Sequence, residues 1–143
     1  KMGVESNTQS FSRPWCLGSV ALAASDEGRR GAAIEEGFTL LSQGAVSHNH
    51  LHFYRAAMEV GLETRNWDLT DRACSGLTNY TGSEPFPWSD YYISRAEILR
   101  EFYQGNNGDQ VVKALLELKD KGEKFGVRSS LSRVENAFRD VAG

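Results

Sequence analysis

The chain has little of what interrupts helices or cross-links a fold, with three prolines and two cysteines in 143 residues. Two cysteines cannot form the dense disulfide framework on which small secreted domains depend. Cys16 and Cys74 both fall in helical patterns. We therefore expect them to be buried free thiols in a reducing cytoplasm, with a disulfide between them as the alternative.

An excess of positive charge and long apolar runs are also absent. Lysine and arginine number 16 against 19 aspartates and glutamates, which gives a net charge of -3, whereas a nucleic-acid surface usually needs a basic excess. No stretch reaches the roughly 18 apolar residues of a membrane span. We therefore expect a cytoplasmic protein with neither nucleic acid nor membrane as its partner. The opening residues Lys1-Met2-Gly3 do not resemble a natural start, so we expect an excised piece of a longer chain.

An internal repeat runs through the chain. Residues 26–33, 66–73 and 107–114 align without gaps, and each segment opens with Asp or Asn and reaches an alanine seven residues later. These alanines are 40 and then 41 residues apart. Four upstream positions keep the same register: Phe11, Leu51 and Tyr92; Leu17, Ala57 and Ile98; Gly18, Met58 and Leu99; and Leu22, Leu62 and Tyr103. Such a period is typical of stacked helical hairpins.

The repeat predicts an all-α fold of about seven helices, since no segment alternates apolar and polar residues for long. The predicted hairpins cover residues 11–46, 47–87 and 88–126 of a single domain, and a capping helix covers 127–142. The first hairpin is expected to begin at residues 12–14. Ser47 and Ser89 are the expected N-caps of the first helices in the second and third hairpins.

Three glycines fall inside the predicted helices, although each costs about 1 kcal/mol relative to alanine. Gly18, Gly61 and Gly76 lie at or beside the small positions of the repeat. We interpret them as points where two helices approach closely, with loop positions as the alternative.

Residues 81–88 contain two of the three prolines and predict a firm break between helices. Phe86 and Trp88 in this segment are expected to cover the junction of the hairpin, with contact to a partner as the alternative.

The turn Arg65-Asn66-Trp67-Asp68, followed by Ala73 and Pro85, resembles the second half of a tetratricopeptide repeat. That resemblance implies a right-handed superhelix of stacked antiparallel hairpins. Further runs resemble the extreme C-terminal region of large bacterial proteins of the adenylate or guanylate cyclase type. These runs are Glu35-Glu36-Gly37, Leu40-Leu41, Ser47-His48-Asn49, Phe53-Tyr54-Arg55, Trp67-Asp68, Glu84-Pro85, Pro87-Trp88 and Arg95-Ala96.

Such proteins join a class III cyclase domain to an AAA-type ATPase module and a long tetratricopeptide-like tail. The resemblance covers roughly residues 33–105. It implies that this chain belongs to the non-catalytic tail of a bacterial signalling protein, whose parent chain carries the cyclase domain.

No catalytic motif is recognisable. The carboxylates with which a class III cyclase holds two metal ions are missing, and no Ser/His/Asp or Cys/His set can be assembled. Gly105-Asn106-Asn107-Gly108 lacks the Lys-Ser/Thr of a phosphate-binding loop and is interpreted as a hairpin turn. We therefore predict that this fragment is not an enzyme and uses no cofactor.

All three histidines lie within residues 47–52. On a helix, His48 and His52 share one face at a spacing that can hold a transition metal. No carboxylate or cysteine at helical spacing completes the ligand set, so we expect local packing and no metal. A metal- or ligand-sensing site at His48 and His52 is the second alternative function.

The main functional prediction is a protein–protein interaction or regulatory domain, whose partner is a protein, a peptide or another domain of the parent chain. In stacked repeats the first helix of each pair usually lines the concave side. The candidate partner-binding residues on these helices are His52, Arg55, Glu59 and Arg95. The two arginines could contact a carboxylate of the partner in bidentate fashion, or could form internal salt bridges with Asp90 or Glu59.

The first alternative is a structural spacer that caps a longer solenoid. Excision would leave the apolar face of the first hairpin bare, so this alternative predicts a homo-oligomer.

Overall fold

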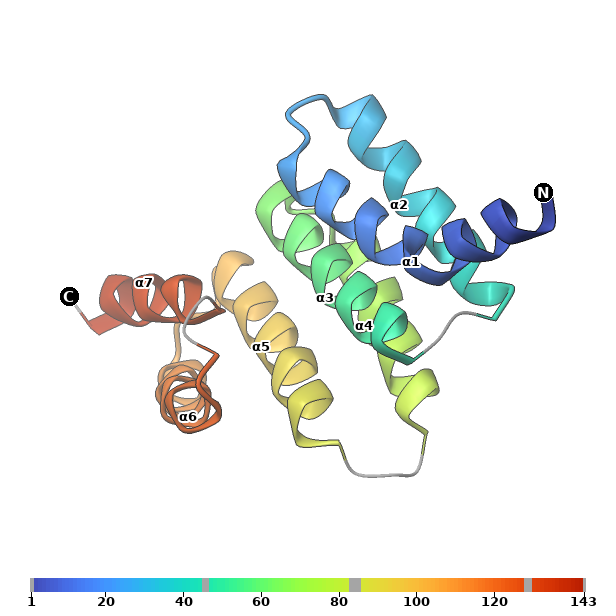
Figure 1. Cartoon of the computed structure of the whole chain (residues 1–143). Helices are drawn as coiled ribbons and strands as arrows, with labels where there is room; N and C mark the ends of the chain where they lie inside the picture. Colours follow the sequence, from blue (N-terminus) through green and yellow to red (C-terminus); the bar gives the residue numbers. More distant parts are fainter. Residues whose placement is uncertain (1, 45–46, 83–85, 128–129, 143) are drawn as a thin grey trace. The chain divides into compact units, whose positions relative to one another are not determined.

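The structure is a computed structural model that describes residues 2–44, 47–82, 86–127 and 130–142, with side chains for 13–44, 49–82, 86–127 and 130–141. Within these residues the chain forms seven α-helices and no strand (Figure 1). The helices are α1 (Met2–Ala23), α2 (Glu27–Ser42), α3 (Ser47–Thr64), α4 (Trp67–Thr81), α5 (Pro87–Tyr103), α6 (Asp109–Phe125) and α7 (Leu131–Ala142). The all-α prediction is confirmed, and the right-handed superhelix stays a prediction. In the described part of the chain, none of the helices is both long and apolar enough to cross a membrane.

The aligned polar turns mark where the second helix of each hairpin begins. Asp26 precedes α2, and its Oδ1 accepts a hydrogen bond from the Gly28 amide at 2.9 Å. Asn66 precedes α4 in the same way, and its Oδ1 accepts from the Leu69 amide at 3.1 Å. Side-chain oxygens at these positions satisfy amides that have no partner in the first helical turn. The repeat inferred from the sequence therefore coincides with side-chain capping at α2 and α4, whereas α6 follows Gly108 and has no side-chain cap.

Three predicted helix starts are wrong. α1 begins at Met2 rather than at residues 12–14, and it contains Pro14, whose ring is fully buried. Packing of this ring outweighs the low helix propensity of proline. α5 begins at Pro87, so Ser89 is not its N-cap but lies inside the helix. α7 begins at Leu131 rather than 127 because α6 ends in a left-handed residue, Gly126, with φ of 70°.

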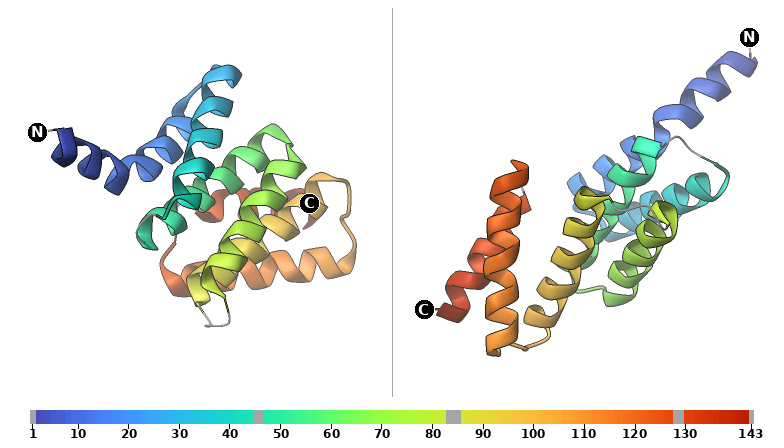
Figure 2. Two further views of the ribbon diagram at one scale, coloured as in Figure 1. Left: turned by 90° about the vertical axis from the view of Figure 1, so that its right-hand side faces the viewer. Right: turned by 90° about the horizontal axis from the view of Figure 1, so that it is seen from below.

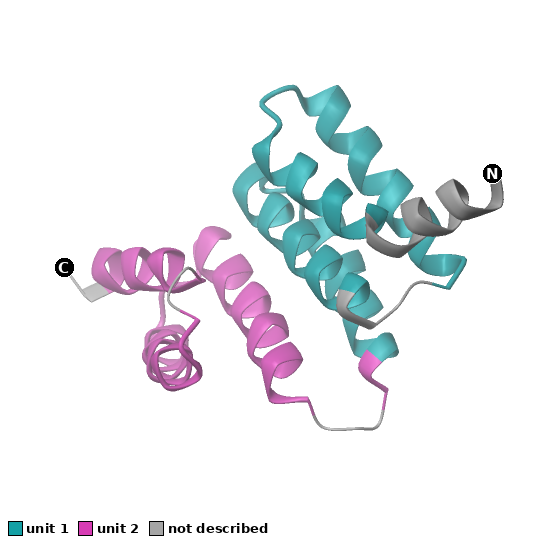
Figure 3. Ribbon diagram, viewed as in Figure 1, with its two compact units in different colours: residues 1–80 teal, residues 81–143 magenta. Residues whose placement is uncertain are grey.

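The chain divides into two compact units, residues 1–80 and 81–143 (Figure 3). In the first unit, α1 packs against both α2 and α3. A Cβ atom added to Gly18 in α1 would lie 3.0 Å from the Ala56 Cβ in α3. The helices therefore approach closely at this glycine, as the sequence predicted.

Glycines also allow close contact between α3 and α4. A Cβ atom at Gly61 would lie 3.0 Å from the Thr70 amide nitrogen, and one at Gly76 would lie 3.0 Å from the Tyr54 hydroxyl. The interpretation of both glycines as contact points is confirmed, because both lie inside helices and face the neighbouring helix.

In the second unit, α5 packs against α6 and α7, and Figure 2 shows α5 and α6 side by side. Tyr91 of α5 shares a hydrogen bond of 2.9 Å with the hydroxyl of Ser130, the residue before α7. A Cβ atom at Gly122 of α6 would overlap Leu131 and lie 2.8 Å from the Tyr91 hydroxyl. The three helices thus meet around Tyr91.

Burial differs from expectation at two places. Cys74 is a buried free thiol as predicted, but Cys16 is exposed, because it lies on a face of α1 that no described element covers. In the break between α4 and α5, Trp88 packs its ring 4.4 Å from that of Tyr92, whereas Phe86 is 41% exposed. The Phe86 ring lies 6.4 Å from that of Trp88, so both aromatics have local contacts, and their covering of the hairpin junction stays a prediction.

Candidate functional site

The first unit contains a groove of about 640 Å³ between α2, the end of α3 and the start of α4. Its floor is apolar, since Ile34 and Val60 are buried there and Leu69 is half-buried. Its rim is charged. The lining residues are Glu27, Arg30, Gly31, Ile34, Glu35, Val60, Thr64, Asn66, Asp68, Leu69 and Arg72. An apolar floor with a few polar groups at its edge is the usual make-up of a binding groove.

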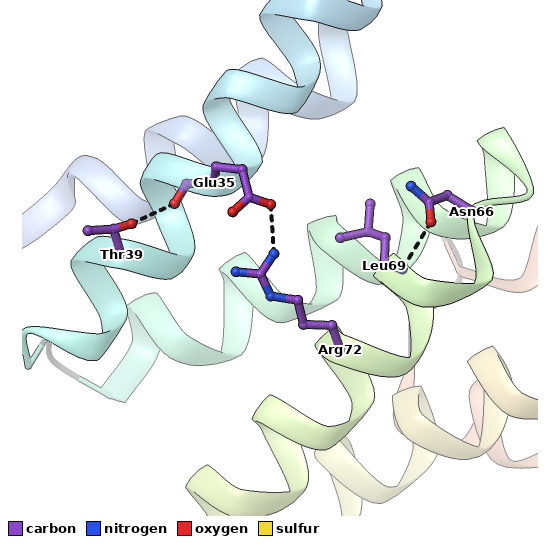
Figure 4. Close-up of polar contacts among 5 residues, drawn as sticks. All are labelled: Glu35, Thr39, Asn66, Leu69 and Arg72. Carbon is purple, nitrogen blue, oxygen red and sulfur yellow. Dashed lines mark hydrogen bonds and ion pairs between the residues drawn. The ribbon is translucent and has the colours of Figure 1, made fainter.

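An ion pair joins α2 and α4 at the edge of the groove (Figure 4). Arg72 Nη1 of α4 lies 2.6 Å from Glu35 Oε1 of α2. The Arg72 guanidinium also lies over the Phe38 ring, 3.8 Å from its centroid. The two charged side chains are 48% and 66% exposed, so the ion pair itself contributes only about 0.2–1 kcal/mol. The main effect of the pair is to hold the Arg72 side chain in one orientation, since its contribution to the stability of the fold is small.

The second arginine of the groove is also occupied by the chain. Arg30 Nε donates a hydrogen bond of 2.9 Å to the carbonyl oxygen of Ala21, and its Nη2 lies 3.8 Å from Glu63 Oε1. Both arginines of the groove therefore already face acceptors of their own unit.

Two carboxylates of the groove have no such partner. Among the described residues, neither Glu27 nor Asp68 takes part in an ion pair or a side-chain hydrogen bond. Glu27 lies in the first turn of α2 and Asp68 in the first turn of α4. Acidic residues are favoured there by the helix dipole, and Asp109 occupies the same place in α6. An acidic residue therefore lies in the first turn of all three second helices, although in the aligned repeat Asp68 and Asp109 correspond to Gly28 rather than to Glu27.

The sequence-based candidates lie elsewhere in the first unit. His52 of α3 is half-buried and stacks on Trp15 of α1, with ring centroids 4.6 Å apart. Arg55 and Glu59 are half-buried on the same helix, and each takes part in an interaction within the chain. None of these three residues lines the groove.

Arg95 is a correction to the predicted partner-binding set. Its side chain is 3% exposed, and its Nε donates a hydrogen bond of 2.9 Å to the Ser130 carbonyl oxygen. The guanidinium therefore joins α5 to the residue before α7 and does not face a partner.

The histidine cluster is described only in part. The side chain of His48 lies outside the described residues. His50 stacks on Tyr80 with ring centroids 4.1 Å apart. Among the described side chains, no group of three His, Cys, Asp or Glu residues is arranged to hold a metal ion.

Burial changes the pKa of two tyrosines. The pKa of Tyr54 is raised because the phenol is removed from water, although the nearby Arg72 guanidinium acts in the opposite direction. Burial likewise raises the pKa of Tyr91, against the hydrogen bond with Ser130 and the positive charge of Arg95. Both phenols are structural, since neither lines the groove.

The groove could not be found from the polar residues of the first helices, because most of its lining comes from the second helices, α2 and α4. The available signal was the acidic residue that recurs at the start of each second helix. Searches of protein-family models, of curated proteins and of solved structures gave no match to this chain.

Proposed function

We propose that this chain is a non-catalytic interaction domain, and that it binds a protein segment in the groove between α2, α3 and α4. The observation that carries the proposal is the groove of about 640 Å³ with an apolar floor and a charged rim. An apolar floor offers a surface that a bound side chain can cover, and the charged groups at the rim fix the orientation of that side chain. The resemblance to tetratricopeptide-like tails of bacterial cyclase-type proteins supports a regulatory role, with a partner that is another protein or another domain of the parent chain.

A bulky side chain placed in the groove tests this proposal. Gly31 lines the groove, and a Cβ atom added there would meet nothing within 4 Å. A Gly31→Trp variant should therefore fill the groove without disturbing the fold. Leu116→Trp is the matched control, because Leu116 is an exposed residue of α6 outside the groove.

The measurement is capture of proteins by each immobilised variant, with helicity checked by circular dichroism. We expect a partner that is retained by the native chain and by Leu116→Trp and is lost with Gly31→Trp. Equal capture by all three proteins would rule out the groove as the binding surface.

A structural spacer that self-associates is a second candidate. The observation that favours it is Trp15, an indole 48% exposed on α1 despite its stacking on His52. Exposed large aromatics often lie in interfaces. Analytical ultracentrifugation should then show a dimer that dissociates in a Trp15→Ser variant, whereas a native chain that remains monomeric would exclude this candidate.

A further inference from the structure

We propose that the groove of the first unit accepts a basic side chain, a lysine or arginine of a partner segment. This inference rests on the proposed function and adds the chemistry of the partner. It follows from which charges of the groove are already balanced within the chain and which are not.

The positive charges of the groove are balanced internally. Arg72 is held by Glu35 and the Phe38 ring, and Arg30 by the Ala21 carbonyl and Glu63. An acidic partner would have to displace these contacts before it could bind either guanidinium.

The negative charges are not all balanced. Glu27 and Asp68 line the groove from two different helices, and neither has an ion-pair partner among the described residues. The groove therefore keeps an excess of negative charge, which is complementary to a cation. Glu27 and Asp68 are both exposed and need not lose water to face such a partner.

The floor of the groove fits the rest of a basic side chain. Lysine and arginine place an aliphatic stem along apolar surface while the charged group stays in water. Leu69, which is half-buried, supplies most of that surface beneath the charged rim, whereas Ile34 and Val60 are only 3% and 2% exposed. An aspartate or glutamate of a partner has a shorter stem and would cover less of it.

A pair of short peptides tests the charge preference. Acetyl-Leu-Lys-Leu-amide and acetyl-Leu-Glu-Leu-amide are titrated into the ¹⁵N-labelled chain, and amide shifts are followed by NMR. We expect the lysine peptide to shift the amides of Gly31, Ile34 and Leu69, and the glutamate peptide to bind at least about fivefold more weakly.

Variants of Glu27 and Asp68 test whether these two carboxylates cause the preference for the lysine peptide. Glu27→Gln/Asp68→Asn should weaken binding of the lysine peptide about tenfold, the change expected when two partly exposed ion pairs are lost. Glu97→Gln/Asp120→Asn is the matched control, since it removes the same charge from exposed positions in the second unit. This control should bind the lysine peptide within about twofold of the native chain.

A charge reversal covers the case in which the first variant is unstable. Glu27→Lys/Asp68→Lys should prefer the glutamate peptide. Equal affinity of the native chain for both peptides at the groove would overturn the basic preference and leave the groove as a binding site. If neither peptide shifts the groove amides and Gly31→Trp captures the same partners as the native chain, both the inference and the proposed function fail.

Discussion

The ring of Phe53 in α3 occupies the space that a Cβ atom would need at Gly37 in α2. Phe53 is fully buried, so the ring cannot turn into solvent to make room. Its edge also contacts Phe38, with ring centroids 5.2 Å apart. The Phe53 ring therefore packs against α2 at both Gly37 and Phe38.

Gly37→Ala should destabilise the first unit by about 1–3 kcal/mol, because the added methyl group would be forced into a close-packed core. Gly31→Ala in the same helix is the control, since it meets no neighbour and should stabilise the unit by up to about 1 kcal/mol through helix propensity. Urea denaturation followed by circular dichroism measures both. Equal stability of the two variants would contradict the packing described for Gly37.

Arg95→Ala should destabilise the second unit by about 1–3 kcal/mol, because it leaves the buried Ser130 carbonyl without its donor. Arg139→Ala removes an exposed arginine of α7 and should change the free energy of unfolding by less than about 0.5 kcal/mol. Thermal and urea denaturation of the two variants provide the comparison. If Arg95→Ala left the free energy of unfolding unchanged, that result would contradict the structural role assigned to the hydrogen bond with Ser130.

The stability of the chain should fall as the pH rises above the ordinary tyrosine pKa of 10.0. Burial raises the pKa of Tyr54 and Tyr91, so the folded chain holds their protons to higher pH than the unfolded chain does. Unfolding then releases protons above pH 10, and the free energy of unfolding decreases with pH in that window. Below pH 10 the two buried phenols are protonated in both states, and their contribution to the free energy of unfolding is fully present.

Urea denaturation at several pH values between 8 and 11.5 measures this slope, and absorbance at 295 nm follows the tyrosinates. A Tyr54→Phe/Tyr91→Phe variant should show a shallower decline with pH than the native chain, whatever its absolute stability. Identical slopes would show that the two phenols are not protected.

The two thiols should differ in reactivity with a disulfide reagent such as Ellman's reagent. Cys16 is exposed and should react at once, whereas Cys74 is buried and should react only as the first unit unfolds. Two kinetic phases of equal amplitude are expected, and a Cys16→Ser variant should lose the fast one. Loss of the slow phase instead would contradict the assignment of burial.

The starts of the second helices could be predicted because they depend on local chemistry. Asp26 and Asn66 cap α2 and α4 through hydrogen bonds that span only two or three residues. The glycine contacts could also be predicted, because a glycine inside a helix needs a reason beyond its own propensity. The start of α1 was missed because Pro14 is normally a helix breaker.

The groove and the burial of Arg95 depend on contacts between distant parts of the chain. Glu35 and Arg72 are 37 residues apart in sequence, and Arg95 and Ser130 are 35 apart. Neither pairing leaves a periodic signal. Arginine is also rarely buried, so composition favoured an exposed position for Arg95, and only the packing of α5 against Ser130 places it inside.

The absence of a side chain at Gly37 also fixes how α2 can move along α3. A shift of α2 by one helical turn would bring Ala33 or Leu41 beneath the Phe53 ring in place of Gly37, and both carry a Cβ atom that the ring cannot accommodate. The Phe53 ring therefore fits only at Gly37, and this fit opposes sliding of α2 along α3. A force directed along the two helices would therefore move α2 and α3 together rather than let them slide past each other, which couples the first hairpin to the second.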